Sequence, residues 1–309
     1  MIEDKNFPQT LQEVIKYFSD ESICIKFFAS LRWVDGVAIC PICKSIETSF
    51  LTTRNVWKCK ACKKQFSIKV GTVLEGSNIG LDKWICAIWM IANCKNGVSS
   101  YEIHRAIGIT QKSAWFMLHR IREAMQTGTF KKLSGNIEVD ETFVGGKAKN
   151  MHKHKREARI QGRGSVGKTA VMGLLERKGN VRAKVIEKVD RETLHNEVKA
   201  NVEKDSNLFT DEWRSYRGLD EQYIHEVINH SIEYVRGHIH TNGIENFWSL
   251  LKRKIKGTYV SVEPFHLNRY VTEQTFRFNE RKGKDKDRFL KMISGISGKR
   301  LKYKELVGD

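Results

Sequence analysis

The pattern of hydrophobic and polar positions along the chain changes near Gly135. Before this point, apolar residues recur every three or four positions in LQEVIKYF, in ESICIKFFASLRWV and over residues 81–93, as they do in helices that bury one face. After it, NIEVDETFVG, TAVMGLLER and VRAKVIEKV have the short apolar runs that are typical of strands. We therefore expect a helical first half and a mixed α/β second half.

In the second half, the predicted strands are followed by helices and strands in alternation. Gly179 and Asn180 separate the second strand from the third with a sequence typical of a hairpin. Beyond them we expect a helix at RETLHNEVKANV, a strand at NLFTDE, a helix near WRSYRGLD, a strand around YIHEVIN and a helix over residues 243–255. Three antiparallel strands followed by this alternation predict a mixed α/β sheet of the ribonuclease H type over residues 134–262. A helical, basic tail is expected over residues 263–309.

The first half is predicted to contain a helical lead over residues 1–36, a small turn-rich module over residues 37–70 and a helical region over residues 71–130. In the helical region, a helix at SSYEIHRAI, a turn at Gly108 and a second helix that begins at Thr110 match a helix-turn-helix. The second helix of that motif enters the major groove of DNA. This region is therefore a candidate DNA-binding element.

Four of the seven cysteines form two closely spaced pairs in the turn-rich module. Cys40 and Cys43 are followed, after fifteen residues, by Cys59 and Cys62. Two such pairs supply four thiolates to one tetrahedral zinc ion, and the many lysines nearby stabilise the thiolate form. Because four protein ligands leave no open coordination position, we predict one structural Zn²⁺ ion. This use of cysteine indicates a reducing compartment rather than a disulfide framework.

Composition narrows the class of protein. The 54 Lys and Arg residues against 36 Asp and Glu residues give a formal net charge of +18, which indicates a polyanionic partner. The 40% hydrophobic content argues against intrinsic disorder. The longest mostly apolar run, WICAIWMIA, is too short to cross a membrane, and MIEDKNFPQT lacks the pattern of a secretory signal. We expect a folded, cytoplasmic protein with no membrane partner.

Three acidic residues of the second half occupy positions from which carboxylates can converge. Asp140 lies on the first predicted strand, and Asp211 ends a later strand, at the sheet edge where ligands collect in such folds. Glu245 begins the helix of HTNGIENFWSLLKRK, seven residues before Lys252, so that both project from the same helix face. Three carboxylates suit Mg²⁺, with Mn²⁺ as a substitute.

Several of these segments together resemble one family. RWVDGVAICPIC, WKCKACKKQFS followed by GTVLEGS, VDETFVGG, and HTNGIENFWSLLKRKIKGTY with a later FRFNER are similar to the insertion-sequence transposases of the IS1595 group, which carry an ISXO2-like catalytic domain. The resemblance covers nearly the whole chain. It implies a zinc ribbon, a helical DNA-binding region and a ribonuclease H-like DDE domain. Asp140, Asp211 and Glu245 are then the acidic triad, and Lys252 is the downstream lysine of a DDEK variant.

The function that this resemblance implies is metal-dependent cleavage at insertion-sequence ends and strand transfer into target DNA. Two Mg²⁺ or Mn²⁺ ions on the triad would stabilise the attacking and leaving oxygens of an in-line displacement. The partners would be double-stranded DNA, as terminal inverted repeats and target, and a homodimer or larger assembly would pair two element ends beside the bacterial nucleoid. The expected DNA contacts are Lys112, Arg120, Lys168, His240, Arg253, Lys254 and Lys256.

Two short motifs suggest other activities. Residues 162–169 contain a literal Walker A pattern, GRGSVGKT, but a strand-like segment follows where a phosphate loop needs a helix. His238 and His240 resemble the histidine pair of nickases that attack DNA through a tyrosine, for which Tyr234 or Tyr259 would be the nucleophile. That interpretation leaves the acidic strand ends unexplained.

The main alternative function is a non-catalytic DNA-binding regulator, such as a domesticated transposase. A zinc ribbon and a helix-turn-helix would suffice for this role, and basic residues that contact phosphates give affinity without identifying chemistry. Loss of Asp140 discriminates between the two functions, because a regulator would keep its activity and a transposase would lose DNA cleavage while still binding.

Overall fold

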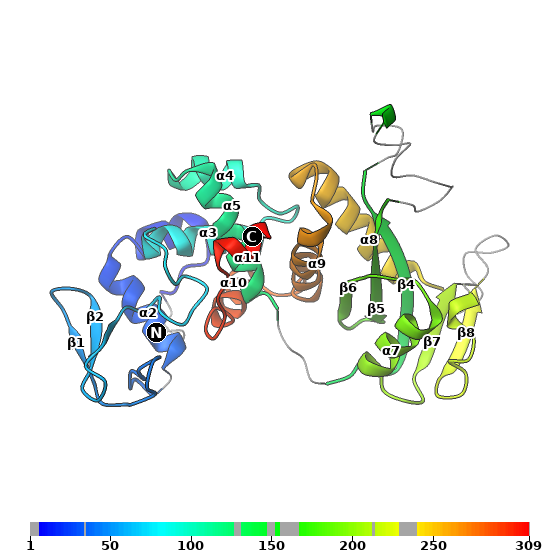
Figure 1. Ribbon diagram of the computed structural model, residues 1–309, viewed down its shortest axis with the longest axis horizontal. Coiled ribbons are helices and arrows are strands. Elements are labelled where there is room, and N and C mark those ends of the chain that lie inside the picture. The colour runs from blue at the N-terminus through cyan, green and yellow to red at the C-terminus, as the bar shows by residue number, and fades with distance from the viewer. Residues whose placement is uncertain are drawn as a thin grey trace. The chain divides into compact units, whose positions relative to one another are not determined.

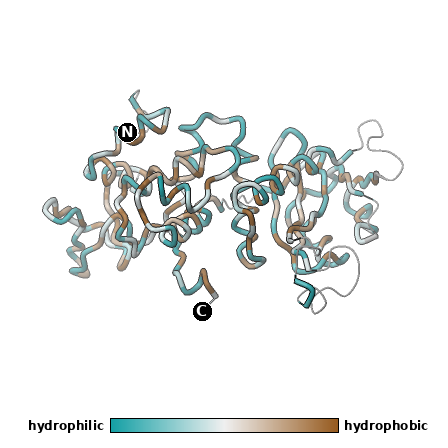
Figure 2. Tube along the Cα trace, turned by 90° about the horizontal axis from the view of Figure 1, so that it is seen from above, coloured by the Kyte–Doolittle hydropathy of each residue, from teal (hydrophilic) through white to brown (hydrophobic). Residues whose placement is uncertain are grey.

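The computed structural model describes residues 6–33, 35–126, 131–146, 152–154, 167–211, 214–228 and 240–308 (Figure 1). The chain folds into two compact units. The first contains residues 1–127 and 282–309, and the second contains residues 128–281. In each unit the hydrophobic positions concentrate in the interior of the packed elements, while the loops at the margins are mainly hydrophilic (Figure 2).

The first unit is mainly helical and is built around α3 (Leu81–Asn93). Trp84, Ile85 and Ile88 of this helix are at most 1% exposed, which explains the apolar run in the sequence. The helices that pack against α3 are α1 (Leu11–Tyr17), α2 (Glu21–Arg32), α4 (Ser100–Ile107), α5 (Gln111–Ala124) and α10 (Asp285–Ser294). A short helix, α11 (Tyr303–Val307), follows near the C-terminus.

The helix pair α4 and α5 forms where the sequence predicts it. Ser99 and Glu102 form a capping box at the start of α4, and Gly108 ends the helix in the left-handed conformation, with φ 63°. Two residues later, the Thr110 side chain accepts a hydrogen bond from the Ser113 backbone N–H and caps α5. The turn is therefore fixed by local chemistry that can be read from the sequence.

The turn-rich module forms a small antiparallel sheet in the first unit. Its strands, β1 (Thr48–Leu51), β2 (Val56–Cys59) and β3 (Gln65–Phe66), lie in the order β1-β2-β3. Trp57 on β2 packs edge to face against Trp33, with ring centroids 4.9 Å apart, and stacks on Phe66 at 6.2 Å. These aromatic contacts give the module a core of its own beside the cysteines.

The second unit contains a five-stranded mixed sheet in the order β6-β5-β4-β7-β8. β4 lies in the middle, antiparallel to β5 and parallel to β7, while β5 and β6 form the predicted hairpin and β8 runs parallel to β7. The strands span β4 (Asn136–Val144), β5 (Thr169–Glu176), β6 (Val181–Ile186), β7 (Asn207–Asp211) and β8 (Ile224–Ile228). Its helical elements include α7 (Arg191–Asn201), η2 (Arg214–Tyr216), α8 (Asn242–Lys254), η3 (Ile255–Tyr259) and α9 (Pro264–Asn279).

The two faces of the large sheet support separate cores, because side chains alternate along each strand. Ile137 and Val139 of β4 pack in one core with Leu194 and Val198 of α7. The other core contains Phe247 of α8 and residues of α9. Asp140 projects from β4 toward this second face, so the fold places it under α8.

Helix α9 covers β6, the edge strand of the sheet. Asn279 accepts a hydrogen bond from the Val181 N–H and donates to the Val181 carbonyl, and Asn268 accepts from the Val185 N–H. These side chains satisfy edge groups that would otherwise be free to pair with another strand. The second unit therefore extends to Arg281, whereas the sequence suggested a boundary at residue 263, and residues 282–309 belong to the first unit.

One predicted helix is only a single turn. In the segment WRSYRGLD the structure has the 3₁₀ turn η2, followed by further turns. Two of its residues, Tyr216 and Leu219, are 1% exposed, so this segment gains its apolar contacts from the core on the α7 face.

The helices in the described part of the chain are all too short or too polar to span a membrane.

Candidate functional site

Asp140 lies in the middle of the sheet and is held by a side chain from α8. The indole Nε1–H of Trp248 donates to Asp140 Oδ2 at 2.9 Å. Gly173 on β5 is the partner of Asp140 across the strands, and a Cβ at this position would lie 2.6 Å from the Trp248 ring. The missing side chain at Gly173 therefore makes the space in which Trp248 reaches Asp140.

Asp211 and Glu245 approach Asp140 from two other elements. Glu138 pairs with Phe209 on the parallel strands β4 and β7, and Asp140 and Asp211 stand two residues further along these strands. Glu245 is in the first turn of α8, where its carboxylate accepts a hydrogen bond from the Thr241 hydroxyl at 3.3 Å. The three acidic residues predicted from the sequence are therefore close enough for the charges of Asp211 and Glu245 to act on Asp140, which lies midway along β4, while Asp211 ends β7.

The electrostatics of Asp140 agree with this arrangement. Burial, together with the negative charges of Asp211 and Glu245, raises the pKa of Asp140 to about 6, against the lowering effect of the Trp248 hydrogen bond. A bound cation would offset this repulsion. The donor set, three carboxylates, consists of the oxygen ligands that Mg²⁺ and Mn²⁺ prefer.

A fourth carboxyl group, which the sequence interpretation did not single out, lies beside this cluster. Glu141 accepts a hydrogen bond from the hydroxyl of Tyr216. Burial raises the pKa of Glu141 to about 8, although the Tyr216 hydrogen bond lowers it. The signal in the sequence is that Glu141 follows the apolar positions Ile137 and Val139, on the face of the strand that should be buried.

The four predicted cysteines of the zinc module lie together. Their sulfur atoms are all within 4.8 Å of one another, with Cys40 and Cys62 at 3.8 Å and Cys43 and Cys59 at 3.5 Å. A tetrahedral site with Zn–S bonds of about 2.3 Å requires sulfur separations of about 3.8 Å. The backbone N–H of Cys62 lowers the pKa of Cys59 to about 6, which favours the thiolate that binds metal. The cluster thus supports a structural Zn²⁺ ion.

Comparison with known proteins matches both of these regions to transposases. Residues 132–279 match the ISXO2-like transposase domain of the IS1595 group, and residues 19–65 match a transposase zinc-ribbon domain. An uncharacterised transposase-like protein of Haemophilus influenzae is 34% identical over 110 residues, which cover 35% of this chain and 89% of that protein. The chain belongs to the ISXO2-like transposase family.

A second relative agrees with this family. An uncharacterised protein in the transposable element ISH50 of Halobacterium salinarum is 27% identical over 252 residues, or 77% of this chain and 84% of its own. The family and the zinc ribbon that the sequence predicted are therefore confirmed. The match over residues 132–279 falls within the second unit of the structure, which includes α9.

Most of the basic residues that we expected to contact DNA are on the surface of the transposase. Lys252, Arg253 and Lys256 are exposed at the end of α8 and in η3. Lys168 is exposed directly before β5, and Lys112 is exposed in the first turn of α5. His240 is half-buried before α8, with its Nδ1 3.3 Å from Glu138 Oε1.

Two residues of that set are buried, and we correct their assignment. Arg120 is 5% exposed, and its guanidinium donates to the carbonyls of Glu75 and Leu301. Lys254 is 2% exposed, with its Nζ 2.9 Å from Glu273 Oε1. Both follow the buried stripes of their helices, because residues three or four positions apart share a face. Both side chains therefore bind partners inside their own units rather than a DNA backbone.

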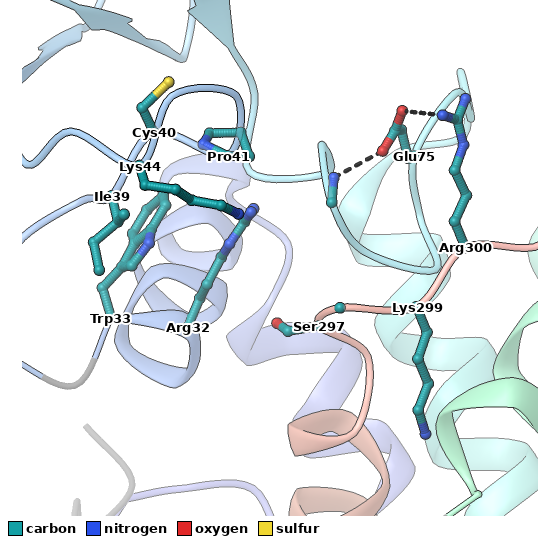
Figure 3. A pocket seen from close by; sticks show the side chains of 12 residues that line it. Arg32, Trp33, Ile39, Cys40, Pro41, Lys44, Glu75, Ser297, Lys299 and Arg300 are labelled. Carbon is teal, nitrogen blue, oxygen red and sulfur yellow. Dashed lines mark hydrogen bonds and ion pairs between the residues drawn. The ribbon is translucent and has the colours of Figure 1, made fainter.

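A pocket of about 460 Å³ lies beside the zinc cysteines in the first unit (Figure 3). Arg32, Lys44 and Arg300 line it, and Glu75 is the one acid among its lining residues. Arg300 forms an ion pair with Glu75 at 2.9 Å, and Arg32 donates to the Ile68 carbonyl at 3.0 Å. The zinc ribbon therefore has basic side chains next to its first cysteine pair.

The structure also bears on the two competing motifs. Residues 162–166 of the Walker A pattern lie outside the described residues, but Thr169 begins β5, so a strand follows Lys168 where a phosphate loop needs a helix. His238 and Tyr234 also lie outside the described residues. Tyr259, the other tyrosine considered, donates its hydroxyl to the Glu273 carboxylate at 2.7 and 2.9 Å.

Proposed function

We propose that this transposase cuts DNA at the ends of its insertion sequence and joins them to target DNA at the Asp140, Asp211 and Glu245 cluster. The observation that carries the proposal is the raised pKa of Asp140, at about 6, to which Asp211 on a neighbouring strand and Glu245 on α8 both contribute. Membership of the transposase family and the exposed Lys252 on the same helix support it.

We also propose that the second unit has the ribonuclease H-like arrangement expected from the sequence. The strand order β6-β5-β4-β7-β8, with an antiparallel hairpin on one side of β4 and parallel strands on the other, supports this assignment. In such a sheet the first strand lies in the centre, and the next parallel strand brings its end beside it. Asp140 and Asp211 lie on these two neighbouring parallel strands, so the topology brings them to adjacent positions.

The acidic residues are proposed to hold two Mg²⁺ or Mn²⁺ ions. Asp140, Asp211 and Glu245 would supply carboxylate oxygens to these ions. Bound ions would stabilise the attacking and leaving oxygens of an in-line displacement at phosphorus.

The chain's own groups would orient the DNA during two successive displacements. In the first, water attacks a phosphodiester at the element end and leaves a 3′ hydroxyl and a 5′ phosphate. In the second, that hydroxyl attacks a phosphodiester of the target, forms a new phosphodiester bond and releases a 3′ hydroxyl on the target strand. Lys252, seven residues from Glu245 on α8, would contact a phosphate oxygen as a point charge. The helix pair α4 and α5, the zinc ribbon and exposed Lys112, Lys168, Arg253 and Lys256 are proposed to hold duplex DNA.

Pairing two element ends requires two active sites, so we propose a homodimer or larger assembly on DNA, which sizing of the DNA complex would detect. Within the cell, this DNA-bound form would be associated with the bacterial nucleoid in the cytoplasm. Half-buried His240 is retained as a candidate DNA contact only through its exposed ring atoms, because its Nδ1 faces Glu138.

A cleavage and joining assay tests the proposed reaction. Purified protein is incubated with labelled duplex carrying the element ends, a target plasmid and Mg²⁺ or Mn²⁺, beside Asp140→Asn and Glu245→Gln. Metal-dependent nicks and joined products that both variants lack would support the proposal. Tight binding of the ends by all three proteins without cleavage or joining by the wild type would favour the non-catalytic regulator.

A further inference from the structure

We propose that Glu138 is a positioning residue of this site. It joins the first turn of α8 to β4 and thereby holds Glu245 in place relative to Asp140. This proposal rests on the proposed DDE function, because that function makes Glu245 a catalytic residue. The contact between Glu138 and α8 can nevertheless be tested without measuring enzyme activity.

The carboxylate of Glu138 is buried and uses both of its oxygens. Glu138 is 1% exposed and lies on the same face of β4 as Asp140, two positions earlier. Its Oε2 accepts from the backbone N–H of Ile244 at 2.9 Å, and its Oε1 accepts from Arg177 Nε at 2.8 Å. A buried carboxylate requires such partners, because an unpaired charge in the interior is very costly.

The bond to Ile244 fixes the part of α8 that carries Glu245. The first N–H groups of a helix have no partner within the helix, and the N-terminal end of its dipole favours negative charge. Glu138 satisfies one of these N–H groups from the neighbouring strand. Because Ile244 directly precedes Glu245, a shift of this anchor moves the backbone of the proposed metal ligand.

Arg177 extends the anchor to the segment before α8. Its Nη2 donates to the backbone carbonyl of His240 at 2.6 Å, and its guanidinium lies 4.0 Å from the ring centre of Phe209 on β7. The His240 ring approaches the same carboxylate, with Nδ1 3.3 Å from Glu138 Oε1. One carboxylate thus connects β4 with the residues on either side of the helix start.

Close packing leaves this helix start little freedom to move. A Cβ at Gly243 would lie 2.6 Å from Leu175 Cδ2 and 2.8 Å from Glu138 Oε2, so the backbone of α8 lies directly against the sheet. Replacing a buried ion pair by apolar groups is often neutral for the free energy of unfolding. A gain in stability therefore does not explain the carboxylate of Glu138, whereas its directional hydrogen bonds to the start of α8 do. Hydrogen bonds of fixed direction define where Glu245 stands.

Hydrogen exchange tests the anchor directly. We would compare wild type, Glu138→Gln and Glu138→Asp with Glu192→Gln, a control that removes an exposed carboxylate from α7 in the same unit. Faster exchange over residues 241–248 in both Glu138 variants, with the rest of the second unit and the control unchanged, is expected. Unchanged exchange in this segment, or an equal increase across the whole unit, would overturn the proposal. Glu138→Asp keeps the charge but is too short to reach Ile244, so it serves even where Glu138→Gln does not fold.

Metal binding gives the second readout. Mutation of a residue that holds a metal ligand in place, without binding the metal itself, typically weakens metal binding by about 10- to 100-fold. We expect the Mn²⁺ concentration that half-saturates the protein, measured by electron paramagnetic resonance, to rise roughly tenfold in the Glu138 variants at unchanged folded fraction. An unchanged value would overturn the positioning role. If wild type and Asp140→Asn bind Mn²⁺ equally and neither cleaves DNA, the proposed function fails, while the exchange data still decide whether Glu138 anchors α8.

Discussion

Asp140 is subject to two opposing requirements. It must be ionised to bind a cation, yet burial and the charges of Asp211 and Glu245 raise its pKa to about 6. Its position on a strand could be predicted because the apolar residues Ile137 and Val139 alternate with polar ones around it. Trp248, which donates to it, is 108 residues away on a helix, and no periodicity in the sequence connects the two.

Asp140→Asn is expected to stabilise the metal-free protein at pH 8 and to leave its stability unchanged at pH 4. The folded-state pKa of about 6 lies above the ordinary value of 3.8, so the folded state binds this proton more tightly than the unfolded state. The stability from this proton is fully present below about pH 4 and is lost as the pH rises through about 6. The loss is at most about 3 kcal/mol, and thermal unfolding in a chelator at both pH values measures it. Equal effects of the substitution at pH 4 and pH 8 would contradict this assignment.

Gly173→Ala is expected to destabilise the second unit by about 1–3 kcal/mol, because overpacking forces neighbouring side chains off their rotamers. The new Cβ would lie 2.6 Å from the Trp248 ring and 2.8 Å from Ile244, so the hydrogen bond to Asp140 should also be disturbed. Chemical denaturation measures the first effect, and the cleavage assay measures the second. Gly146→Ala is the matched control, since no atom lies within 4 Å of its added Cβ. If Gly173→Ala lowered the free energy of unfolding no more than the control, the space that Trp248 occupies beside Gly173 would not be closely packed.

At the scale of elements, local chemistry explains why most helices and strands could be predicted. The cap at Thr110 and the left-handed Gly108 fix the turn between α4 and α5, and strand alternation identifies β4 and β5. The predicted helix near WRSYRGLD is only a single 3₁₀ turn, because its apolar side chains are buried by the tertiary core rather than along a helix stripe. Arg120 and Lys254 were misassigned for a related reason: their charge suggested the surface, whereas their helix phase buries them.

Cys59→Ser is expected to lower bound zinc below one ion per chain and to unfold the module of β1, β2 and β3. Structural zinc sites contribute directly to folding free energy, on the order of 10 kcal/mol in zinc-finger peptides. Metal analysis and hydrogen exchange over residues 37–66 measure the loss, while α3 should remain protected by its own buried core. Cys86→Ser, which removes a half-buried thiol outside the cluster, is the control. Normal zinc content in Cys59→Ser would exclude this residue as a ligand.

At the scale of the whole molecule, the two ends of the chain meet in the first unit. Phe289 of α10 is fully buried, stacks on Phe27 at 6.1 Å and packs against Trp89 at 5.2 Å. The last residues of the chain thereby complete a core begun by the first helices, although the catalytic domain lies between them in sequence.

Phe289→Ala is therefore expected to destabilise the first unit by about 3–5 kcal/mol, the cost of a large aromatic cavity. Tryptophan fluorescence during chemical denaturation reports mainly on this unit, because five of the seven tryptophans belong to it and only Trp213 and Trp248 belong to the second. Phe265→Ala, an exposed aromatic residue on α9, provides a comparison in the second unit and should cost little. An equal, small effect of both substitutions would mean that the C-terminal segment does not stabilise the first unit.

The sequence by itself predicted the zinc cysteines from their spacing and most helices and strands from their periodicity. The resemblance of whole segments to a family indicated the family and the roles of the three acidic positions. Only the tertiary structure decided that α9 covers the edge of the sheet, that residues 282–309 return to the first unit and that Arg120 and Lys254 are buried. It also revealed Glu138 beneath the start of α8. These features depend on which distant surfaces pack together, and contacts between residues about 100 positions apart leave no periodic pattern in a single sequence.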